Sequence, residues 1–190
     1  MTKKGNIFII LGIICLIGAG VLISINVYHD NEAHEYTQIA YEKIQQEVED
    51  ISDADVSDSN DMKVINIDGE DYIGTIEIPA LNLELPVNAD WDYKKMKKGP
   101  CRYYGSFITN DLVICGHSYK RVFGRLKNLV VGDLLIFTDM NNNEYIYKVE
   151  LVEILSPKDI KEMIESDFDL TLYSCTNDGL NRVTVRLNRI

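Results

Sequence analysis

Two side chains in this sequence could together break and remake an amide bond. Cys175 ends the apolar stretch LTLYSC and precedes the polar loop TNDGLNR, so its thiol is expected where a strand meets the surface. His117 ends a similar stretch, in LVICGHS, and no histidine follows it in the chain. A thiolate attacks a carbonyl carbon, and an imidazole transfers the protons that this reaction requires. Cys175 and His117 are therefore predicted to act as nucleophile and as general acid or base.

Two arginines lie in the segment that follows the cysteine loop. Arg182, Thr184 and Arg186 are spaced two residues apart, so they share one face of a strand. A guanidinium beside Cys175 would stabilise the negative charge that develops on the attacked carbonyl oxygen. The spacing alone does not decide which of the two arginines performs this task. The three residue types together indicate acyl transfer through a cysteine.

The elements that must position these residues are mostly short strands. From Met62 onward the apolar residues recur with a period of two, as in strands with one buried face. The predicted strands cover residues 72–78, 81–87, 112–115, 134–137, 145–152, 170–174 and 183–187. Two short helices are expected, one over 91–98 and one from Ser156, the N-cap, through Pro157 to about Glu165. This pattern predicts an all-β barrel or sandwich.

A long apolar segment occupies the N-terminal part of the sequence. Residues 7–25 contain Ser24 as their only polar side chain apart from glycines, and a helix of this length spans roughly 28 Å, close to a bilayer's hydrocarbon core. A cleaved signal peptide is the alternative, because residues 18–20 are small. The apolar run continues beyond them, which favours an uncleaved anchor. The lysines at 3–4 predict a cytoplasmic N-terminus and an extracellular body.

The acidic charge of the chain is concentrated behind this apolar segment. The net charge is −11, and residues 30–71 hold 14 acids against Lys43 and Lys63. A nucleic-acid-binding function is excluded, because such proteins depend on a basic surface. The one local basic run, KKMKK at 94–98, is either a solvated helix face or a contact for an anionic wall polymer.

Residues 28–61 are predicted to form a stalk. Its first part has a weak apolar stripe at helical spacing, made of Ile39, Ala40, Ile44, Val48 and Ile51, which would lie against the body or a partner. Residues 52–61, SDADVSDSND, have the composition of a solvated spacer. The stalk is expected to hold the body away from the membrane.

No cofactor or metal site is predicted. The four cysteines include no CxxC pair and are too few for a disulfide scaffold. Cys115 is expected to pack in its strand and Cys101 to be exposed in a loop; a disulfide between them is permitted, but simple packing is preferred. Calcium modulation would need Glu77, Asp133 and Asp139 to converge, and nothing in the sequence indicates that they do.

The chain resembles the sortase family, the membrane-anchored cysteine transpeptidases of Gram-positive bacteria. The family's TLxTC signature and following arginine appear as TLYSC (171–175) and Arg182, and its Gly-His element appears as ICGHS (114–118). IPALNLELPV (78–87) and FGRLKNLVVGD (123–133) also match, in the family's order. The similarity spans roughly residues 72–190.

The resemblance implies an eight-stranded β-barrel and an organisation in three parts. These are an N-terminal transmembrane anchor at 1–27, an acidic stalk at 28–61 and a catalytic barrel at 62–190. The partners implied are secreted proteins with an LPxTG-like sorting signal and an amine of a peptidoglycan precursor or cell-wall peptide. The enzyme would be a single-pass protein of the cell membrane with its catalytic domain outside.

The resemblance also assigns roles to individual residues. Cys175 would be the nucleophile, His117 the general acid or base, and Arg182 the oxyanion partner. Thr171, Ser174 and Ser118, the hydroxyl residues in the two matching motifs, are the predicted substrate-binding residues. Ser174 departs from the family's threonine; it keeps the hydroxyl but loses the β-branch, so altered packing or substrate preference is expected.

The class of sortase and two other functions stay open. The interval of 58 residues from His117 to Cys175 is too short for class B, and residues 52–72 lack the Asp-Pro-aromatic lid of class C, which favours class A, D or E. A cysteine protease or hydrolase would use the same pair of residues and finish with water. A non-catalytic, membrane-tethered binding module would tolerate loss of Cys175.

Overall fold

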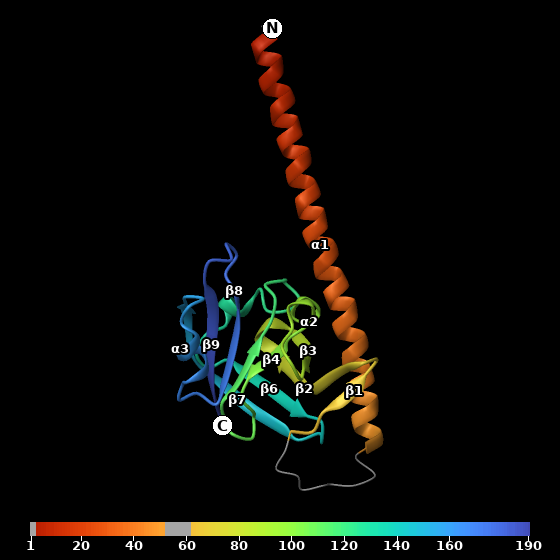
Figure 1. Ribbon diagram of the computed structural model, residues 1–190, viewed down its shortest axis with the longest axis vertical. Helices are drawn as coiled ribbons and strands as arrows, with labels where there is room; N and C mark the ends of the chain where they lie inside the picture. Colours follow the sequence, from red (N-terminus) through yellow and green to blue (C-terminus); the bar gives the residue numbers. More distant parts are fainter. Residues whose placement is uncertain (1–2, 52–61) are drawn as a thin grey trace.

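The protein consists of a long helix and a β-barrel, and a computed structural model describes residues 3–51 and 62–190 (Figure 1). The long helix is α1 (Lys3–Ile51), and the short helices are α2 (Tyr93–Lys98), α3 (Ile160–Ile164) and the 3-10 turns η1 (Pro79–Leu81) and η2 (Leu126–Asn128). The strands are β1 (Ile65–Ile67), β2 (Glu70–Ile78), β3 (Leu83–Asn88), β4 (Cys101–Tyr104), β5 (Leu112–Cys115), β6 (Leu134–Asp139), β7 (Glu144–Leu155), β8 (Leu170–Cys175) and β9 (Arg182–Arg189).

Eight of these strands close into a barrel. The sheet order is β1-β2-β3-β4-β5-β8-β9-β7-β6, and β6 pairs again with β2, so the ring from β2 to β6 has no free edge. β1 pairs with β2 and lies outside this ring. The pairs β3–β4 and β5–β8 are parallel, and the other pairs are antiparallel. The predicted eight-stranded barrel is therefore confirmed.

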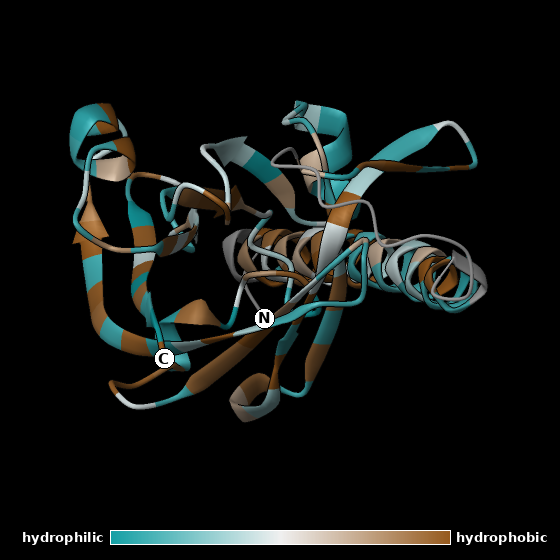
Figure 2. Ribbon diagram, turned by 90° about the horizontal axis from the view of Figure 1, so that it is seen from below, coloured by the Kyte–Doolittle hydropathy of each residue, from teal (hydrophilic) through white to brown (hydrophobic). Residues whose placement is uncertain are grey.

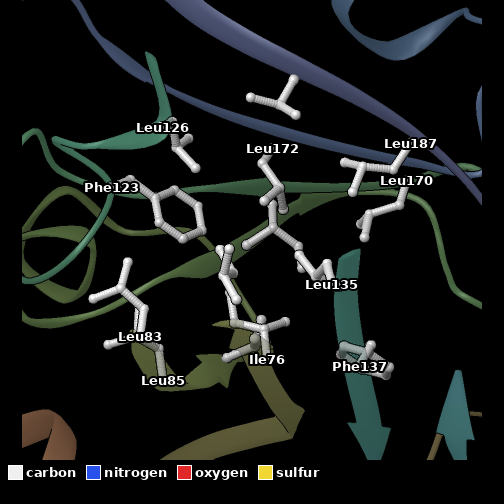
Figure 3. Close-up of a cluster of buried hydrophobic side chains, with 14 of the residues drawn as sticks. Ile76, Leu83, Leu85, Phe123, Leu126, Leu135, Phe137, Leu170, Leu172 and Leu187 are labelled. Carbon is white, nitrogen blue, oxygen red and sulfur yellow. The ribbon is translucent and has the colours of Figure 1, made fainter. Parts of the chain in front are cut away.

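The inside of the barrel is filled by one apolar cluster. Apolar and polar residues alternate along the strand ribbons (Figure 2), as the period of two predicted, and the buried apolar side chains meet in one cluster (Figure 3). Among them are Ile76, Leu83, Leu85, Leu135, Phe137, Leu170, Leu172 and Leu187, with Phe123 and Leu126 from the segment after β5. The alternation breaks at a bulge between Val149 and Leu151, which leaves Leu151 39% exposed and turns Val152 toward the core.

The C-terminal half of α1 lies along the outside of the barrel (Figure 1). Its buried residues are Ala33, Thr37, Ala40, Ile44 and Val48, at steps of three and four, and they pack toward β1, β3 and α2. The predicted stripe is confirmed at its middle three positions but wrong at Ile39, which is 48% exposed. Burial of a side chain such as Ile44 contributes about 1.5–3 kcal/mol. The helical part of the stalk is therefore fixed to the barrel and is not a free spacer.

Further expectations concern the end of the stalk and the N-terminal apolar segment. The side chain of Ile51 and the predicted spacer at 52–61 lie outside the described part of the structure. Near the N-terminus, α1 is long and apolar enough to cross a membrane, and no residue of its most apolar window is buried within the protein. The N-terminal apolar helix is thus present, consistent with a membrane anchor.

Two short strands and two helix starts differ from the expectations. β1 and β4 were not predicted; β4 has the sequence CRYY, which shows no apolar alternation. The second helix begins at Ile160 and not at Pro157, because the backbone N–H of Ser156 donates to the Asp159 carboxylate and makes a turn there. α2 begins at Tyr93, two residues later than expected, with the Asp92 carboxylate accepting from the N–H groups of Lys94 and Lys95.

Candidate active site

The three predicted catalytic residues lie at the ends of neighbouring strands, in the order β5, β8, β9. Cys175 is directly opposite Arg182 in the antiparallel β8–β9 pair. In the parallel β5–β8 pair, Cys115 is opposite Tyr173, so two residues further along each chain His117 comes beside Cys175. Neighbouring strands are about 4.8 Å apart. Cys175 is therefore paired with Arg182 on one side, and the segment that carries His117 continues from the strand on its other side.

All three residues belong to the outer face of the barrel. The inward residues of these strands are Leu112 and Ile114 of β5, Leu170 and Leu172 of β8, and Val183 and Val185 of β9. Cys175 and Arg182 alternate with them and are half-buried, as is His117. The candidate site is therefore on the outer surface of the barrel, where these half-buried side chains are open to solvent.

The loop between Cys175 and Arg182 is held by its own hydrogen bonds. The N–H of Thr176 donates to the carbonyl of Asn181 at 2.9 Å, and the N–H of Gly179 donates to the carbonyl of Thr176 at 2.8 Å. Gly179 has φ +74°, a conformation that favours glycine. Arg182 donates from Nη1 to the Asn181 carbonyl at 3.0 Å. This contact uses part of the guanidinium and leaves its other donors for a substrate.

His117 is packed against an aromatic ring and has a lowered pKa. Its ring centroid lies 4.1 Å from that of Tyr119, and its backbone N–H donates to the Met96 carbonyl at 3.2 Å. Burial is the main cause of the lowered pKa of His117, and the nearby Lys97 cation lowers it further. Its Nδ1 is buried and has no hydrogen-bond partner among the described residues. Burial and the Lys97 cation thus both favour the neutral form of the His117 imidazole.

The segment after His117 is fixed to the barrel by close contacts. A side chain at Gly116 would collide with Phe123, since an added Cβ would lie 2.6 Å from that ring. The Ser174 hydroxyl donates to the Phe123 carbonyl at 3.1 Å, and the Phe123 N–H donates to the His117 carbonyl at 3.1 Å. The residue before the cysteine thereby helps to hold the backbone that carries the histidine.

The structure distinguishes the two candidate arginines. Arg186 is 3% exposed, and its Nε donates to the Glu153 carboxylate at 2.9 Å. Its other nitrogens donate to the Thr171 hydroxyl at 2.9 Å and to the carbonyls of Glu162 and Met163. Arg186 is therefore committed to joining α3 to the barrel, while Arg182 borders Cys175.

The three predicted substrate-binding hydroxyls have different surroundings. Ser174 is buried and faces the Phe123 carbonyl, and Thr171 is buried against Arg186. Ser118 follows His117 and is half-buried. Their substrate contacts stay a prediction, and of the three, Ser118 has the surface access that such a contact needs.

Several side chains near Cys175 and His117 could not be identified from the sequence. Tyr173 lies next to Cys175 on the same face, its ring meets that of Tyr103 edge-on, and Tyr103 meets Trp91 in the same way. Tyr119 and Lys97 adjoin His117 only because α2 and the segment after β5 fold together there. Aromatic residues in strands or loops are common, so nothing in the sequence marks these as neighbours of the site.

Two free thiols lie on the neighbouring strands β4 and β5. Cys101 and Cys115 face each other across the β4–β5 pair, and both are fully buried. The expectation that Cys101 is exposed in a loop is wrong, because β4 joins the barrel at this point. Burial raises the pKa of Cys101 to about 12 and also raises the pKa of Cys115, so both are inert thiols.

The carboxylates considered for calcium do not converge. Asp139 accepts hydrogen bonds from the N–H groups of Asn141 and Asn143 and from the Tyr145 hydroxyl. Asp133 accepts one from the N–H of Val130. Within residues 3–51 and 62–190, no group of three or more histidine, cysteine or acidic side chains is placed to hold a metal ion.

A half-buried cysteine flanked by histidine and arginine on the outside of a closed barrel is an arrangement suited to cysteine-dependent acyl transfer. Residues 76–190 match the family described as the sortase domain, which covers more than half of the chain. The chain therefore belongs to the sortase family. It is a cysteine transpeptidase of the cell-wall sorting type, and sortases are membrane-anchored enzymes of the cell surface that act on LPxTG-type signals and cell-wall amines.

Individual relatives agree with this family. The chain is 28% identical to Sortase A of Bacillus anthracis, over 92% of this chain and 90% of that protein. Sortase C1 of Streptococcus suis superposes with a TM-score of 0.54 and 26% identity, covering 63% of this chain and 73% of that one. A sortase D5 transpeptidase of Clostridium perfringens, at 18% identity, has a TM-score of 0.59 over 84% of this chain and 99% of that one, and shows the shared fold.

Proposed function

We propose that Cys175, His117 and Arg182 perform the transpeptidation, with Cys175 as nucleophile. The single observation that supports this proposal is the β8–β9 register, which pairs Cys175 with Arg182, next to β5, the strand that leads into His117. The commitment of Arg186 to Glu153 supports the choice of Arg182.

The first half of the reaction forms a thioester. The Cys175 thiolate attacks the carbonyl carbon of the scissile peptide bond in the sorting signal, and the oxygen gains negative charge. Arg182 donates hydrogen bonds to this oxygen, and these bonds strengthen as the charge develops. The protonated form of His117 gives its proton to the departing amine, the C–N bond breaks, and the C-terminal fragment leaves.

The second half transfers the acyl group to a cell-wall amine. Neutral His117 removes a proton from the incoming primary amine as its nitrogen attacks the thioester carbon. The C–S bond then breaks and the thiolate is regenerated. Water is the competing nucleophile, so the hydrolase alternative differs only in this step. The proposed donor is a secreted protein with an LPxTG-like signal, and the proposed acceptor is a peptidoglycan precursor or cell-wall peptide amine.

The proposal extends to the organisation and class of the enzyme. Residues 1–27 would be the transmembrane anchor, 28–61 the stalk and 62–190 the catalytic domain. The N-terminal lysines support a cytoplasmic N-terminus with the barrel outside. The interval between His117 and Cys175 contains one short α-helix, α3, and the 3-10 turn η2, which supports class A, D or E. Sortases of more than one class share this barrel, so the class proposal depends on the interval and not on the fold.

Mass spectrometry of the full chain in detergent tests the proposed reaction. The protein is mixed with a panel of LPxTG-like peptides, with and without glycine-type or diaminopimelate-type amines. We expect an acyl adduct on Cys175 that one amine class resolves into a ligated peptide. An adduct that only water resolves would favour the hydrolase. Absence of any adduct, together with no labelling of Cys175 by a thiol-reactive probe, would contradict the nucleophile assignment.

The pH profile should report His117. Its pKa is lowered by burial and by Lys97, so the acid-side limb of kcat/KM is expected below the ordinary histidine value of about 6.5. Lys97→Gln removes the repulsion of the imidazolium and should move this limb to higher pH. Lys127→Gln, an exposed lysine on η2, is the control. An unchanged limb in Lys97→Gln would show that another group sets it.

A further inference from the structure

A basic pocket lies between α1 and α2, next to the predicted catalytic histidine. Its volume is about 330 Å³, and it is lined by His29, Glu32, Ala33, Lys94, Lys97, Lys98 and Tyr119. A second basic group, Lys120, Arg121 and Arg125, borders another pocket against the same helix. Basic side chains therefore line two pockets along α1, in a chain whose net charge is −11.

The α2 lysines that line the pocket are not neutralised within the protein. Lys94, Lys97 and Lys98 make no salt bridge in the described part of the chain, whereas Lys95 pairs with Glu70 at 3.0 Å. Lys98 instead lies over the ring of Tyr36, 4.7 Å from its centroid. Three ammonium groups are thus available to an external anion.

Nearby carboxylates already have partners. Glu32 contacts His29 at 3.3 Å, and Asp30 accepts the backbone N–H of Arg121 at 3.0 Å. The Asp92 carboxylate caps α2, which lowers its pKa and occupies it with backbone N–H groups. Among the described residues, none of these acids forms a salt bridge with Lys94, Lys97 or Lys98.

The position of the pocket along α1 points to the membrane surface. α1 is one unbroken helix, so His29 lies four residues, or about 6 Å, beyond the end of the apolar run at Ile25. Ala33 lies about 12 Å beyond it. The headgroup layer adds roughly 5–8 Å to each side of the hydrocarbon core, and the Debye length in physiological salt is about 8 Å. The pocket is therefore within reach of lipid phosphates.

Exposed aromatic residues accompany the lysines. Tyr28 is 66% exposed at the end of the apolar run, and Trp91 and Tyr93 at the start of α2 are 49% and 56% exposed. Tryptophan and tyrosine favour the membrane–water interface. In Figure 1, α2 and the β8–β9 loop lie at the end of the barrel that points toward the N-terminus of α1. The aromatic and basic side chains thus share the end that carries the predicted site.

We propose that one surface of the protein docks on an anionic lipid bilayer and holds the predicted active site at the membrane. This surface, here called the α2 surface, consists of Trp91, Tyr93, Lys94, Lys97 and Lys98. The proposal rests on the membrane anchor that the proposed function assigns to α1. An anchored chain would otherwise pivot on the bilayer; docking fixes the barrel so that His117 and Cys175 face substrates arriving along the membrane. Each lysine near such a surface strengthens docking by about fivefold.

Trp91 gives a direct readout, because it is the only tryptophan in the chain. The full chain is reconstituted into vesicles of phosphatidylcholine, with or without phosphatidylglycerol, that contain a lipid with a nitroxide on its headgroup. We expect strong quenching of Trp91 fluorescence in the vesicles with phosphatidylglycerol and weak quenching in the neutral ones. The triple variant K94Q/K97Q/K98Q should weaken docking about 100-fold and lose the difference. High salt should have the same effect.

The matched control is K127Q/K158Q/K161Q, which removes the same charge from exposed lysines outside the α2 surface. It should be quenched like the unmodified chain. Equal quenching in both lipids, or quenching that survives the α2 triple variant, would overturn the proposal. So would a Trp91 response to soluble polyphosphate in neutral vesicles without any response to phosphatidylglycerol, since the lysines would then serve a soluble polymer.

Flotation of the same vesicles separates this proposal from the anchor on which it rests. Protein that floats with the vesicles but shows no lipid-dependent quenching would refute docking and leave the anchor intact. Protein that does not float would refute the anchor and, with it, the docking. The peptide-ligation assay in detergent requires no bilayer, so the catalytic assignment is tested independently of both.

Discussion

Replacing Cys175 by alanine is expected to abolish acyl-enzyme formation and to lower turnover by more than about 1,000-fold. In the proposed mechanism the Cys175 thiol forms the covalent intermediate, and His117 and Arg182 assist only that step and its reversal. The substitution leaves β8 intact, because the β8–β9 backbone pairing does not involve the side chain. The variant should therefore fold normally and be inactive.

Peptide turnover and adduct mass measure this effect together. Cys15→Ala is the matched control, because Cys15 lies exposed on the apolar part of α1, far from the barrel. It should form the adduct at the normal rate. Ligated product from Cys175→Ala at more than a trace level would refute the nucleophile assignment and leave the binding-module alternative to be tested.

The parts of this fold that were predictable are those in which each strand has its own apolar alternation. β2, β5, β8 and β9 were placed within a few residues because their inward side chains are apolar at every second position. β4 was missed because its sequence, CRYY, has no apolar alternation, and only Cys101 among its four residues is buried. β5, LVIC, is buried at every position, and its continuous apolar sequence made it recognisable.

Some residues of the candidate site could be predicted from the sequence, and others could not. Cys175 and His117 were found because each is a reactive residue directly after an apolar strand. Spacing alone left the choice between Arg182 and Arg186 open, and the family resemblance selected Arg182. The physical basis of that choice, the β8–β9 register and the contacts of α3, is not specified by a single sequence. Tyr119 and Lys97 were missed for a related reason. Their roles come from the packing of α2 and the following loop around His117, which is tertiary structure.

The weak apolar stripe of the stalk did not reveal how firmly this helix packs on the barrel. Weak amphipathicity at Ala40, Ile44 and Val48 is compatible with a solvated spacer, yet these residues are buried against the barrel, near Tyr72 and Met140. The consequence is functional. Because the helix is fixed to the barrel, the orientation of its apolar segment also fixes the orientation of the candidate active site. A flexible stalk would leave the two independent.

Arg182→Ala is expected to lower kcat/KM by about 100- to 1,000-fold, the usual cost of removing one oxyanion donor. Most of the loss should appear in kcat, because Arg182 binds the charge that exists in the transition state more strongly than the neutral carbonyl. Arg182→Lys should recover part of the activity by restoring the charge without the forked geometry. Burst-phase kinetics of acyl-enzyme formation measure the effect at the chemical step.

Arg186→Ala is the matched comparison on the same strand and face. Its guanidinium joins Glu153 and Thr171 to the carbonyls of α3, so its loss leaves buried acceptors unpaired and should lower the free energy of unfolding by about 3–5 kcal/mol. The remaining folded fraction should still form the acyl-enzyme. If Arg186→Ala instead abolishes acylation at unchanged stability while Arg182→Ala is mild, the oxyanion role belongs to Arg186. The register that places Arg182 beside Cys175 would then not describe the catalytic state.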